Sequence, residues 1–458
     1  MLIDKRDNVE VDISSGHKYA VRFIASGEKI IKYGYPIGIA TSDINSGEKV
    51  HTHNMKTALS GKLEYSYQPT DELFTVNKSD MTFMGYMREN GEAAIRNEVW
   101  IVNTVGCVNK VAERLAALTG AACFTHPYGC SQLGDDMTLT QKILCGLVNH
   151  PNAAGVLVLG LGCENNNIDA FKKALGEYDK DRVLFLNCQS FDDEIAEGTA
   201  LIERLKARAQ RYKREPVPVS KLKIGLKCGG SDAFSGITAN PLVGRVSDRL
   251  ISLGASTVLS EVPEMFGAET ILMNRCESKE VFEKTVSLIN NFKDYYTSHN
   301  QVIYDNPSPG NKDGGITTLE EKSLGCIQKA GRAPVVDVLD YGDTVRENGL
   351  SLLNGPGNDI VAVTNLTAAG VHMVLFTTGR GTPLGGPVPT VKISTNTALS
   401  CKKPSWIDFD AGKCLDETNS TCTDELFNLI IAVAEGKETR NEINNYREIA
   451  IFKDGVTL

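Results

Sequence analysis

Four apolar runs in the sequence each end in a glycine next to a cysteine. They are residues 101–107 (IVNTVGC), 124–130 (FTHPYGC), 156–163 (VLVLGLGC) and 224–230 (IGLKCGG). Each run has the length and composition of a buried strand in a parallel sheet, and the glycine permits a sharp turn at its end. Ligands of open α/β sheets collect at the carboxyl ends of the strands. The spacing therefore predicts that four thiols face one substrate crevice, as soft metal ligands or wall residues: Cys107, Cys130, Cys163 and Cys228.

The alternative interpretation is that these cysteines are small buried hydrophobic residues with only a packing role. The second run also contains Pro127, which favours a loop over a strand. The prediction of a shared crevice therefore depends on the junctions lying at strand ends of one sheet.

Three of the seven histidines lie within the first 53 residues. His51 and His53 alternate in the segment VHTHN, so on a strand their rings would share a face, and His17 lies in the same region. Neutral imidazoles on one face suit a divalent transition metal. The alternative is a solvated pair on a turn. We expect these three residues to bind the catalytic metal ion, at an interface with the larger part of the chain.

Residues 227–240 (KCGGSDAFSGITAN) predict a strand, a glycine turn and then the amino terminus of a helix at Ser231 and Asp232. The free backbone N–H groups of such a terminus bind carboxylate or phosphate. Lys227 would add a positive charge, or act as a base if its pKa is lowered. The alternative is an ordinary glycine turn with Ser231 or Asp232 as an N-cap.

Three further segments hold candidate polar groups. Arg380 and Thr382 lie in the glycine loop 377–389, where the planar guanidinium could clamp a carboxylate. Glu261 and Glu264 follow an expected strand at 257–260 and are candidate proton carriers, with a solvated loop as the alternative. Loop 306–315 is rich in Gly, Pro and Asn and has the character of a functional lid.

The elements that must position these residues are of α/β type. Residues 1–70 read as a small β-domain with glycine turns, and 71–98 as a linker. Apolar strands alternate with helical segments over 99–215, and a second α/β unit follows over 216–458, with expected strands that include 335–337, 360–363 and 372–377. Such alternation predicts two Rossmann-like units with mostly parallel sheets.

Composition excludes several classes of partner. The 458 residues carry a net charge of −9, which argues against nucleic acid and against an anionic membrane surface. No apolar run has the length needed to span a bilayer, and the amino terminus lacks a signal-peptide core. The twelve cysteines are scattered without a CxxC pair, so we expect reduced thiols and a cytoplasmic protein.

Longer motifs extend over nearly the whole chain. They are GHKYA, IIKYGYPIG, HTHN, RNEVWIVNTVGCVN, HPYGCSQLGDD, GLGCENN, KCGGSDAFSGITANP, EVPEMFGAE, NPSPGNKDGGITTLEEKSLGC, TTGRGTPLGG and the closing FKDGVTL. Together they resemble the altronate/galactarate dehydratase family of sugar-acid dehydratases. HTHN is closer to the altronate dehydratase branch of that family.

The resemblance implies a small amino-terminal β-clip (SAF, antifreeze-like) domain before the α/β catalytic region. It also implies a hydro-lyase that removes water from D-altronate to give 2-dehydro-3-deoxy-D-gluconate in hexuronate catabolism, with Fe²⁺ or Mn²⁺ as cofactor. Metal-bound carboxylate and C2 hydroxyl would stabilise the enediolate formed when a base removes the C2 proton. The candidate catalytic groups are Lys227, Glu261 and Glu264.

Other functions stay open at this stage. They are a galactarate or other sugar-acid or sulfo-acid lyase on the same scaffold, and a sugar-acid binder without catalysis. A thiol-held iron–sulfur cluster is a further chemical option. The sequence leaves the oligomeric state undecided, with a homo-oligomer as one option.

Overall fold

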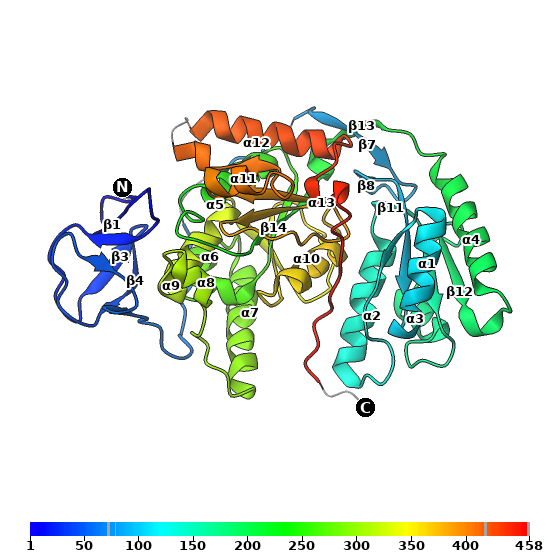
Figure 1. The fold of residues 1–458 in the computed structure, drawn as a ribbon, viewed down its shortest axis with the longest axis horizontal. Coiled ribbons are helices and arrows are strands. Elements are labelled where there is room, and N and C mark those ends of the chain that lie inside the picture. The colour runs from blue at the N-terminus through cyan, green and yellow to red at the C-terminus, as the bar shows by residue number, and fades with distance from the viewer. Residues whose placement is uncertain (71–73, 78, 416–418, 456–458) are drawn as a thin grey trace.

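The computed structural model describes the chain except for residues 71–73, 78, 416–418 and 456–458. Three parts follow one another along the longest axis (Figure 1). The amino-terminal part lies at one end, and a four-stranded α/β unit lies at the other. A seven-stranded α/β unit occupies the centre, although it comes last in the sequence. The expected class, a small β-domain before two parallel α/β units, is confirmed.

The amino-terminal part consists of two small antiparallel sheets. Ile24 and Ile44 are fully buried and joined by paired backbone hydrogen bonds, and Gly27 and Gly47 adopt left-handed φ angles of 84° and 82° three residues after each. The repeated Ile-x-x-Gly pattern therefore marks two equivalent turns. The strands are β1 (Val9–Val11), β2 (Lys18–Ala20), β3 (Lys29–Lys32), β4 (Tyr35–Ala40), β5 (Lys49–Val50) and β6 (Met55–Lys56).

The four-stranded parallel sheet has the order β10-β9-β11-β12. Its central strand β11 is buried at every residue, because helices cover both faces. The strands are β9 (Glu98–Asn103), β10 (Ala122–Phe124), β11 (Ala153–Gly160) and β12 (Val183–Asn187). The helices are α1 (Asn109–Thr119) and α4 (Glu194–Ala209) on one face, and α2 (Gly134–Asn149) and α3 (Ile168–Leu175) on the other.

A small antiparallel sheet lies between the two α/β units in space (Figure 1), and its strands come from before and after the four-stranded unit in sequence. It consists of β7 (Thr82–Met87), β8 (Ala93–Ala94) and β13 (Glu215–Pro218). Strand β13 pairs with β7 in antiparallel register, so the chain leaves the four-stranded unit beside the point where it entered. The segment expected as a linker thus contains two of the three strands of this sheet.

The seven-stranded sheet is parallel throughout and has the order β16-β17-β15-β14-β18-β19-β20. Its strands are β14 (Lys223–Cys228), β15 (Ser256–Leu259), β16 (Val335–Leu339), β17 (Leu350–Leu353), β18 (Met373–Thr378), β19 (Thr390–Ser394) and β20 (Phe409–Asp410). The helices are α5 (Ala239–Ser252), α6 (Glu269–Met273), α7 (Lys279–Ser298), α8 (Pro309–Asp313), α9 (Leu319–Cys326), α10 (Asp359–Ala368), α11 (Thr397–Lys402), α12 (Asn419–Ala434) and α13 (Arg440–Ile443).

One expected strand is wrong, since residues 360–363 belong to helix α10. The Asn358 side chain caps this helix by accepting a hydrogen bond from the Val361 backbone. Most of the helix is buried, from Val361 to Ala368, so its apolar residues are not confined to one face. A short apolar run of this kind does not distinguish a buried helix from a buried strand.

A buried ion triad joins the amino-terminal part to the central unit. Lys18 Nζ and Lys32 Nζ each lie 2.8 Å from a different carboxylate oxygen of Glu321 in α9. The Lys18 ammonium also donates to the backbone oxygen of Gly315 and to Thr317. Burial alone would raise the pKa of Glu321, but the two ammonium groups hold it at about 2.

We expect Glu321→Gln to lower the free energy of unfolding by about 3–5 kcal/mol, because it leaves two buried ammonium groups without their carboxylate. Urea unfolding at neutral pH measures this loss. Glu280→Gln is the control, since it removes an exposed partner of Lys284 on α7 and should cost no more than about 0.5 kcal/mol. Equal effects of the two changes would contradict the proposed importance of the triad.

The low pKa of Glu321 predicts that the folded protein loses stability in acid. The pKa of Glu321 is lower in the folded protein than in the unfolded chain. Its contribution to the free energy of unfolding is therefore complete above pH 4.5 and is lost as the pH falls toward about 2. The urea midpoint of the unaltered protein should therefore fall more steeply over this range than that of Glu321→Gln. Parallel pH profiles would refute this assignment.

Candidate functional site

The site lies where the order of the seven-stranded sheet reverses. The chain passes from β14 to β15 on one side and later returns to β18 on the other side of β14. Ligands of open α/β sheets bind at the carboxyl ends of strands at such a switch point. Here a cavity of about 680 Å³ opens beside the ends of β14 and β15. Its polar and charged lining includes Cys228, Glu264, Asn306, Ser308, Asn311, Lys312, Lys322 and Asp359.

A chain of buried charges lies beneath this cavity. The Lys227 ammonium forms ion pairs with the carboxylates of Glu261 and Asp359, the latter at 2.9 Å. Lys329 Nζ lies 3.2 Å from the second oxygen of Glu261, which also accepts a hydrogen bond from the Cys228 backbone. Among these groups only Asp359 is appreciably exposed, so it connects the buried charges to the cavity.

The two glutamates of this site have opposite pKa shifts. Burial raises the pKa of Glu261 to about 7, and the nearby charge of Glu264 adds to this effect. Burial would also raise the pKa of Glu264, but Lys322 and other lysines hold it at about 2. Lys322 Nζ lies 2.8 Å from Glu264, and this partner raises the lysine pKa to about 12. Glu261 can therefore exchange a proton near neutral pH, whereas Glu264 and Lys322 stay charged.

Glu261 has an unusual backbone conformation. Its φ angle of 72° places it in the left-handed region that residues with a side chain rarely adopt. It follows Ser260 directly after β15, and its carboxylate turns back under the end of β14. Such strain is found where the surrounding structure requires a particular side-chain position.

Two thiols and a carboxylate meet at the floor of the cavity. Cys228 Sγ, Cys326 Sγ and a Glu264 oxygen all lie within 4.8 Å of one another, and they are the only three-ligand group of this kind among the described residues. A hydrogen bond from Cys326 holds the pKa of the Cys228 thiol well below its usual value, and the Lys329 ammonium adds to this effect. The same hydrogen bond raises the pKa of Cys326. The group has the composition of a metal site.

The predicted helix start at Ser231 and Asp232 is wrong. Helix α5 begins only at Ala239, because Asp232 is buried and holds its own loop by accepting hydrogen bonds from Ser235 and Thr395. Ser231 lies nearer the cavity, since its hydroxyl is 2.8 Å from Cys228 Sγ. Neither residue presents a helix terminus to a ligand.

The predicted arginine clamp lies at the edge of the site. The backbone N–H of Arg380 donates to the oxygen of Gly230, a cavity residue, but the Arg380 side chain is exposed to solvent. Thr382 follows two residues later and accepts a hydrogen bond from the Leu384 backbone. Neither side chain lines the cavity, so their substrate contacts stay a prediction.

The structure brings two of the three predicted histidines together. The rings of His17 and His51 are 5.8 Å apart at their centroids, and His51 Nε2 lies 3.0 Å from the Lys312 oxygen at the cavity rim. His53 is exposed on the following turn. His17 Nδ1 is buried without a hydrogen-bond partner, so it is available as a ligand. The role of this set as metal ligands stays a prediction.

The four predicted thiols do not line one cavity. Cys228 is buried at the end of β14, whereas Cys107, Cys130 and Cys163 are exposed on the four-stranded sheet. None of these three lines the cavity of Cys228. The expectation of one shared crevice fails because the strands that carry these cysteines belong to two separate sheets.

Several site residues were missed from the sequence. They are Lys322, Cys326, Lys329 and Asp359, which lie far along the chain from the glutamates and Lys227. Three of them lie in or just after the segment LEEKSLGC of α9. The sequence signal was a further glycine–cysteine pair, Gly325–Cys326, at the end of a helix. The segment around it also carries four charged residues, Glu320, Glu321, Lys322 and Lys329. Loop 306–315 does border the cavity, as its composition suggested.

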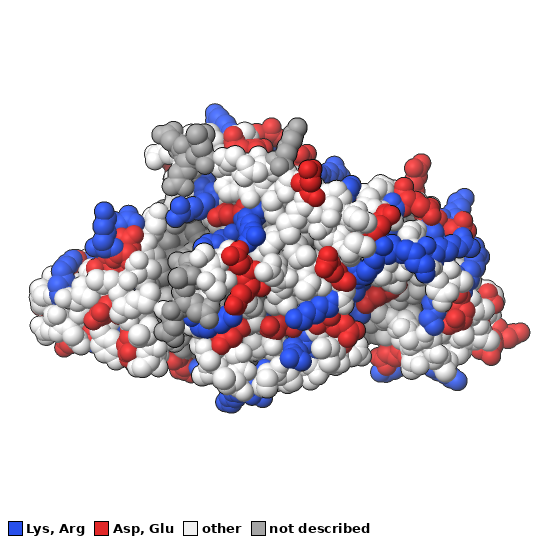
Figure 2. Space-filling view, turned by 90° about the horizontal axis from the view of Figure 1, so that it is seen from above, with Lys and Arg blue, Asp and Glu red and all other residues white. Residues whose placement is uncertain are grey.

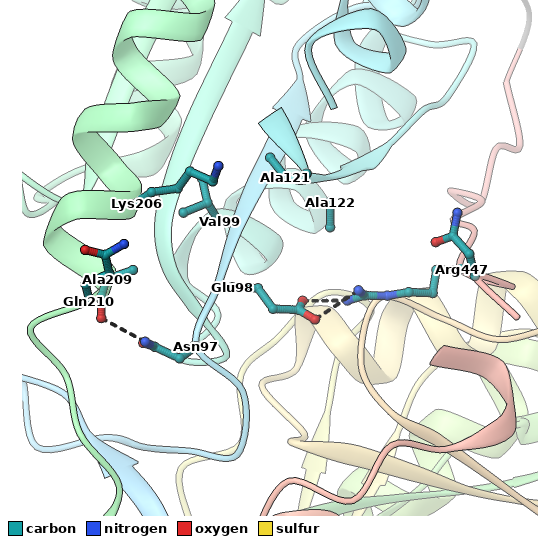
Figure 3. A pocket seen from close by; sticks show the side chains of 11 residues that line it. Asn97, Glu98, Val99, Ala121, Ala122, Lys206, Ala209, Gln210 and Arg447 are labelled. Atoms are coloured by element: carbon teal, nitrogen blue, oxygen red, sulfur yellow. Dashed lines mark hydrogen bonds and ion pairs between the residues drawn. The ribbon is translucent and has the colours of Figure 1, made fainter. Parts of the chain in front are cut away.

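A second cavity, of about 410 Å³, lies at the edge of the four-stranded sheet where β9 and β10 begin (Figure 3). Its wall includes Glu98, which pairs with Arg447 of the carboxyl-terminal segment at 2.7 Å. Sheets of this type bind ligands at the other edge, where the strands have their carboxyl ends. We therefore interpret this cavity as a gap bridged by the Glu98–Arg447 pair.

Figure 2 shows acidic and basic side chains interspersed on one face, without a broad patch of one sign. Among the helices of the described residues, none is both long and apolar enough to cross a membrane.

Three family models match consecutive parts of the chain. The altronate/galactarate dehydratase SAF domain matches residues 3–58, which confirms the expected type of the amino-terminal domain. The second domain of D-galactarate dehydratase/altronate hydrolase matches residues 85–210, and the D-galactarate/altronate dehydratase C-terminal domain matches residues 219–457.

Curated relatives match over nearly the full length. An altronate dehydratase of Bacillus subtilis (strain 168) is 54% identical over 98% of this chain and 93% of the relative. An altronate dehydratase of Escherichia coli (strain K12) is 52% identical over the same shares. A galactarate dehydratase (L-threo-forming) of Escherichia coli (strain K12) is 31% identical over 96% of this chain and 90% of the relative.

Proposed function

Because the chain belongs to the altronate/galactarate dehydratase family, we propose that it is a hydro-lyase that removes water from D-altronate to give 2-dehydro-3-deoxy-D-gluconate. The relatives most similar over the whole chain carry the name altronate dehydratase, which supports altronate over galactarate. The observation in the structure that supports the chemistry is the charge chain from Glu261 through Lys227 to Asp359 at the cavity.

The cavity has the chemical character that a sugar acid requires. Lys322 and Lys312 offer positive charge to the substrate carboxylate, while Asn306, Ser308 and Asn311 offer hydrogen bonds to hydroxyl groups. The charged and hydrogen-bonding groups of this lining suit a small hydrophilic anion. We propose that these side chains orient the C2–H bond toward Asp359.

The proton transfers follow from the pKa values of the site. The C2 proton leaves toward Asp359 and passes by way of the Lys227 ammonium to Glu261, whose pKa of about 7 lets it accept a proton at neutral pH. The C3–O bond then breaks, and the proton held by Glu261 returns by way of Lys227 and Asp359 to the departing hydroxyl to form water. Glu264 keeps Lys322 charged and in place. The enol product tautomerises to the 2-keto acid.

We propose Fe²⁺ or Mn²⁺ as the cofactor, held by His17 and His51 with His53 nearby. The unpartnered His17 Nδ1 and the adjoining His51 ring fit such an ion, since imidazole nitrogens suit these metals. When bound, the ion would supply charge stabilisation for the enediolate. The Cys228–Glu264–Cys326 group is the competing metal site.

The compartment and assembly are further parts of the proposal. None of the twelve cysteines forms a disulfide, all of them lying within the described residues, which supports a reducing compartment such as the cytoplasm. The substrate is a small molecule, so the chemistry requires no macromolecular partner. A homo-oligomer stays compatible with this function.

We expect D-altronate to be the preferred substrate of a panel that also contains galactarate, mannonate and gluconate. Keto-acid formation is measured anaerobically with added Fe²⁺ or Mn²⁺. Preference for another acid would refute the altronate assignment but keep the dehydratase class. Binding of altronate without turnover in the presence of either metal would instead indicate a sugar-acid binder.

Glu261→Gln should reduce turnover by about 10²–10⁴-fold, the range for a general base. In the unaltered protein, kcat/KM should fall as the pH drops below about 7, because the base must be ionised to accept the proton. Thermal unfolding of the variant shows whether the loss has a structural origin. If kcat/KM of the Glu261→Gln variant still fell below about pH 7 as in the unaltered protein, the role of Glu261 would be contradicted.

Replacing His51 and His53 together by alanine should lower both bound metal and turnover. Metal content after dialysis is measured by elemental analysis, with His299→Ala as a control, because that histidine pairs with Asp454 at the surface. Full metal content and full activity in the double variant would reject the histidine site. The Cys228–Glu264–Cys326 group would then be the candidate metal site, and Cys326→Ser would test it.

A further inference from the structure

Three exposed thiols have no part in the dehydration proposed above. Cys107, Cys130 and Cys163 lie on the four-stranded unit, and each follows a glycine directly. Of the twelve cysteines, all within the described residues, only these three and Cys401 are exposed. Cysteine is among the residue types most often buried, so the gathering of three exposed thiols on one unit calls for a reason other than packing.

The topology places these thiols around a ligand-binding position. Strand β9 lies between β10 and β11, so the order of this sheet reverses at β9 just as that of the larger sheet reverses at β14. Cys107, Cys130 and Cys163 follow β9, β10 and β11 respectively, all beyond their carboxyl ends. Ligands of open α/β sheets bind outside the strand ends at such a reversal.

Hydrogen bonds hold the three cysteine loops against one another. The Gly106 backbone N–H donates to the Tyr128 oxygen at 2.8 Å, and the Asn166 N–H donates to the Gly129 oxygen at 3.0 Å. The Asn166 side chain also donates to the Thr104 oxygen at 3.0 Å. Asn166 is fully buried and thus ties the third loop to both of the others.

The glycine before each cysteine is required by this close approach. A Cβ atom on Gly129 would lie 2.0 Å from the Thr104 oxygen, and one on Gly106 would lie 2.8 Å from the His126 oxygen. Gly162 has a φ of 129°, and its Cβ would meet the Asn187 side chain at 2.7 Å. The repeated glycine–cysteine pair thus brings three loops together and leaves one thiol at the surface of each.

The three sulfur atoms are not arranged to hold a single metal ion. One tetrahedral ion holds its sulfur ligands about 2.3 Å away, so those sulfurs must lie close together. These three sulfur atoms do not all lie within 4.8 Å of one another, since the only three-ligand group of that size among the described residues is Cys228, Glu264 and Cys326. In a cluster each thiolate binds its own iron atom, so the sulfurs stand farther apart.

We propose that Cys107, Cys130 and Cys163 bind an iron–sulfur cluster of the [4Fe–4S] type at the carboxyl edge of the four-stranded sheet. The three thiolates bind three irons, and the fourth iron has no cysteine ligand. The Gln189 side chain donates to Cys163 Sγ at 3.6 Å, and hydrogen bonds of this kind to cluster sulfurs tune the potential.

Cys188 at the same edge is a less suitable ligand. It follows β12 directly but packs against the apolar cluster beneath α1 and α4. Burial raises the pKa of its thiol to about 11, which disfavours the thiolate that binds iron. This cysteine therefore offers a control at the same edge of the sheet.

The test uses the full chain, purified anaerobically and reconstituted with equal amounts of ferrous and ferric iron and with sulfide. We expect broad visible absorption, with about four irons and about four acid-labile sulfides per chain. Cys107→Ala, Cys130→Ala and Cys163→Ala should each lose most of the labile sulfide. Cys188→Ala and Cys401→Ala should retain it. Thermal unfolding of the apo forms confirms that all five variants fold.

Absence of labile sulfide from the reconstituted protein would overturn the proposal, as would a full sulfide content in any of the three variants. A single bound ion without sulfide would overturn it too. Labile sulfide is measured without turnover, so this inference goes beyond the proposed dehydration and can fail independently of it. Altronate turnover in a sulfide-free protein would leave the dehydratase function in place.

Discussion

Helix α9 imposes the constraint on which the other parts of the molecule depend. Every one of its eight residues is buried, although the sequence LEEKSLGC carries three charges. Buried charges are tolerated only when they are paired, so each must find a partner on another part of the chain. Glu321 binds two lysines of the amino-terminal part, and Lys322 binds Glu264 at the cavity. Glu320 accepts hydrogen bonds from Thr57 and Ala58.

This arrangement explains how a small β-domain contributes to a site on a distant sheet. The ion triad fixes the domain against α9, and His51 then meets the Lys312 oxygen at the cavity rim. The same helix ends at Cys326, whose Sγ lies 2.9 Å from a carboxylate oxygen of Glu264. The position of the domain and the electrostatics of the site therefore both depend on the paired charges of one buried helix.

The two parallel sheets place different chemical groups at the same topological position. In both, the strand order reverses around the first strand, and residues beyond the strand ends gather there. The larger sheet collects buried lysines and carboxylates, of which Glu261 has a pKa near neutrality. The smaller sheet collects exposed thiols on glycine turns. A buried charge chain suits proton transfer, and exposed thiols suit a soft metal.

The sequence by itself determined the local elements and the kind of chemistry. Apolar runs predicted strands β9, β11, β14 and β18, because buried parallel strands are apolar throughout. The order of α/β alternation predicted the class, and the resemblance of long motifs predicted the family. The sequence also predicted that Glu261 and Glu264, in the loop after β15, are candidate proton carriers. These features depend on residues close together in the chain.

Only the tertiary structure decided which candidates share a site. Cys228 and Cys107 end similar strands, yet they lie on different sheets, because sheet membership depends on long-range pairing. The apolar segment of α10 predicts a strand but forms a helix, since burial on several sides removes the helical pattern from the sequence. The pairings of Lys322 with Glu264 and of Lys329 with Glu261 join residues about 60 positions apart. No local pattern encodes such a pairing; it follows from the requirement that buried charges find partners.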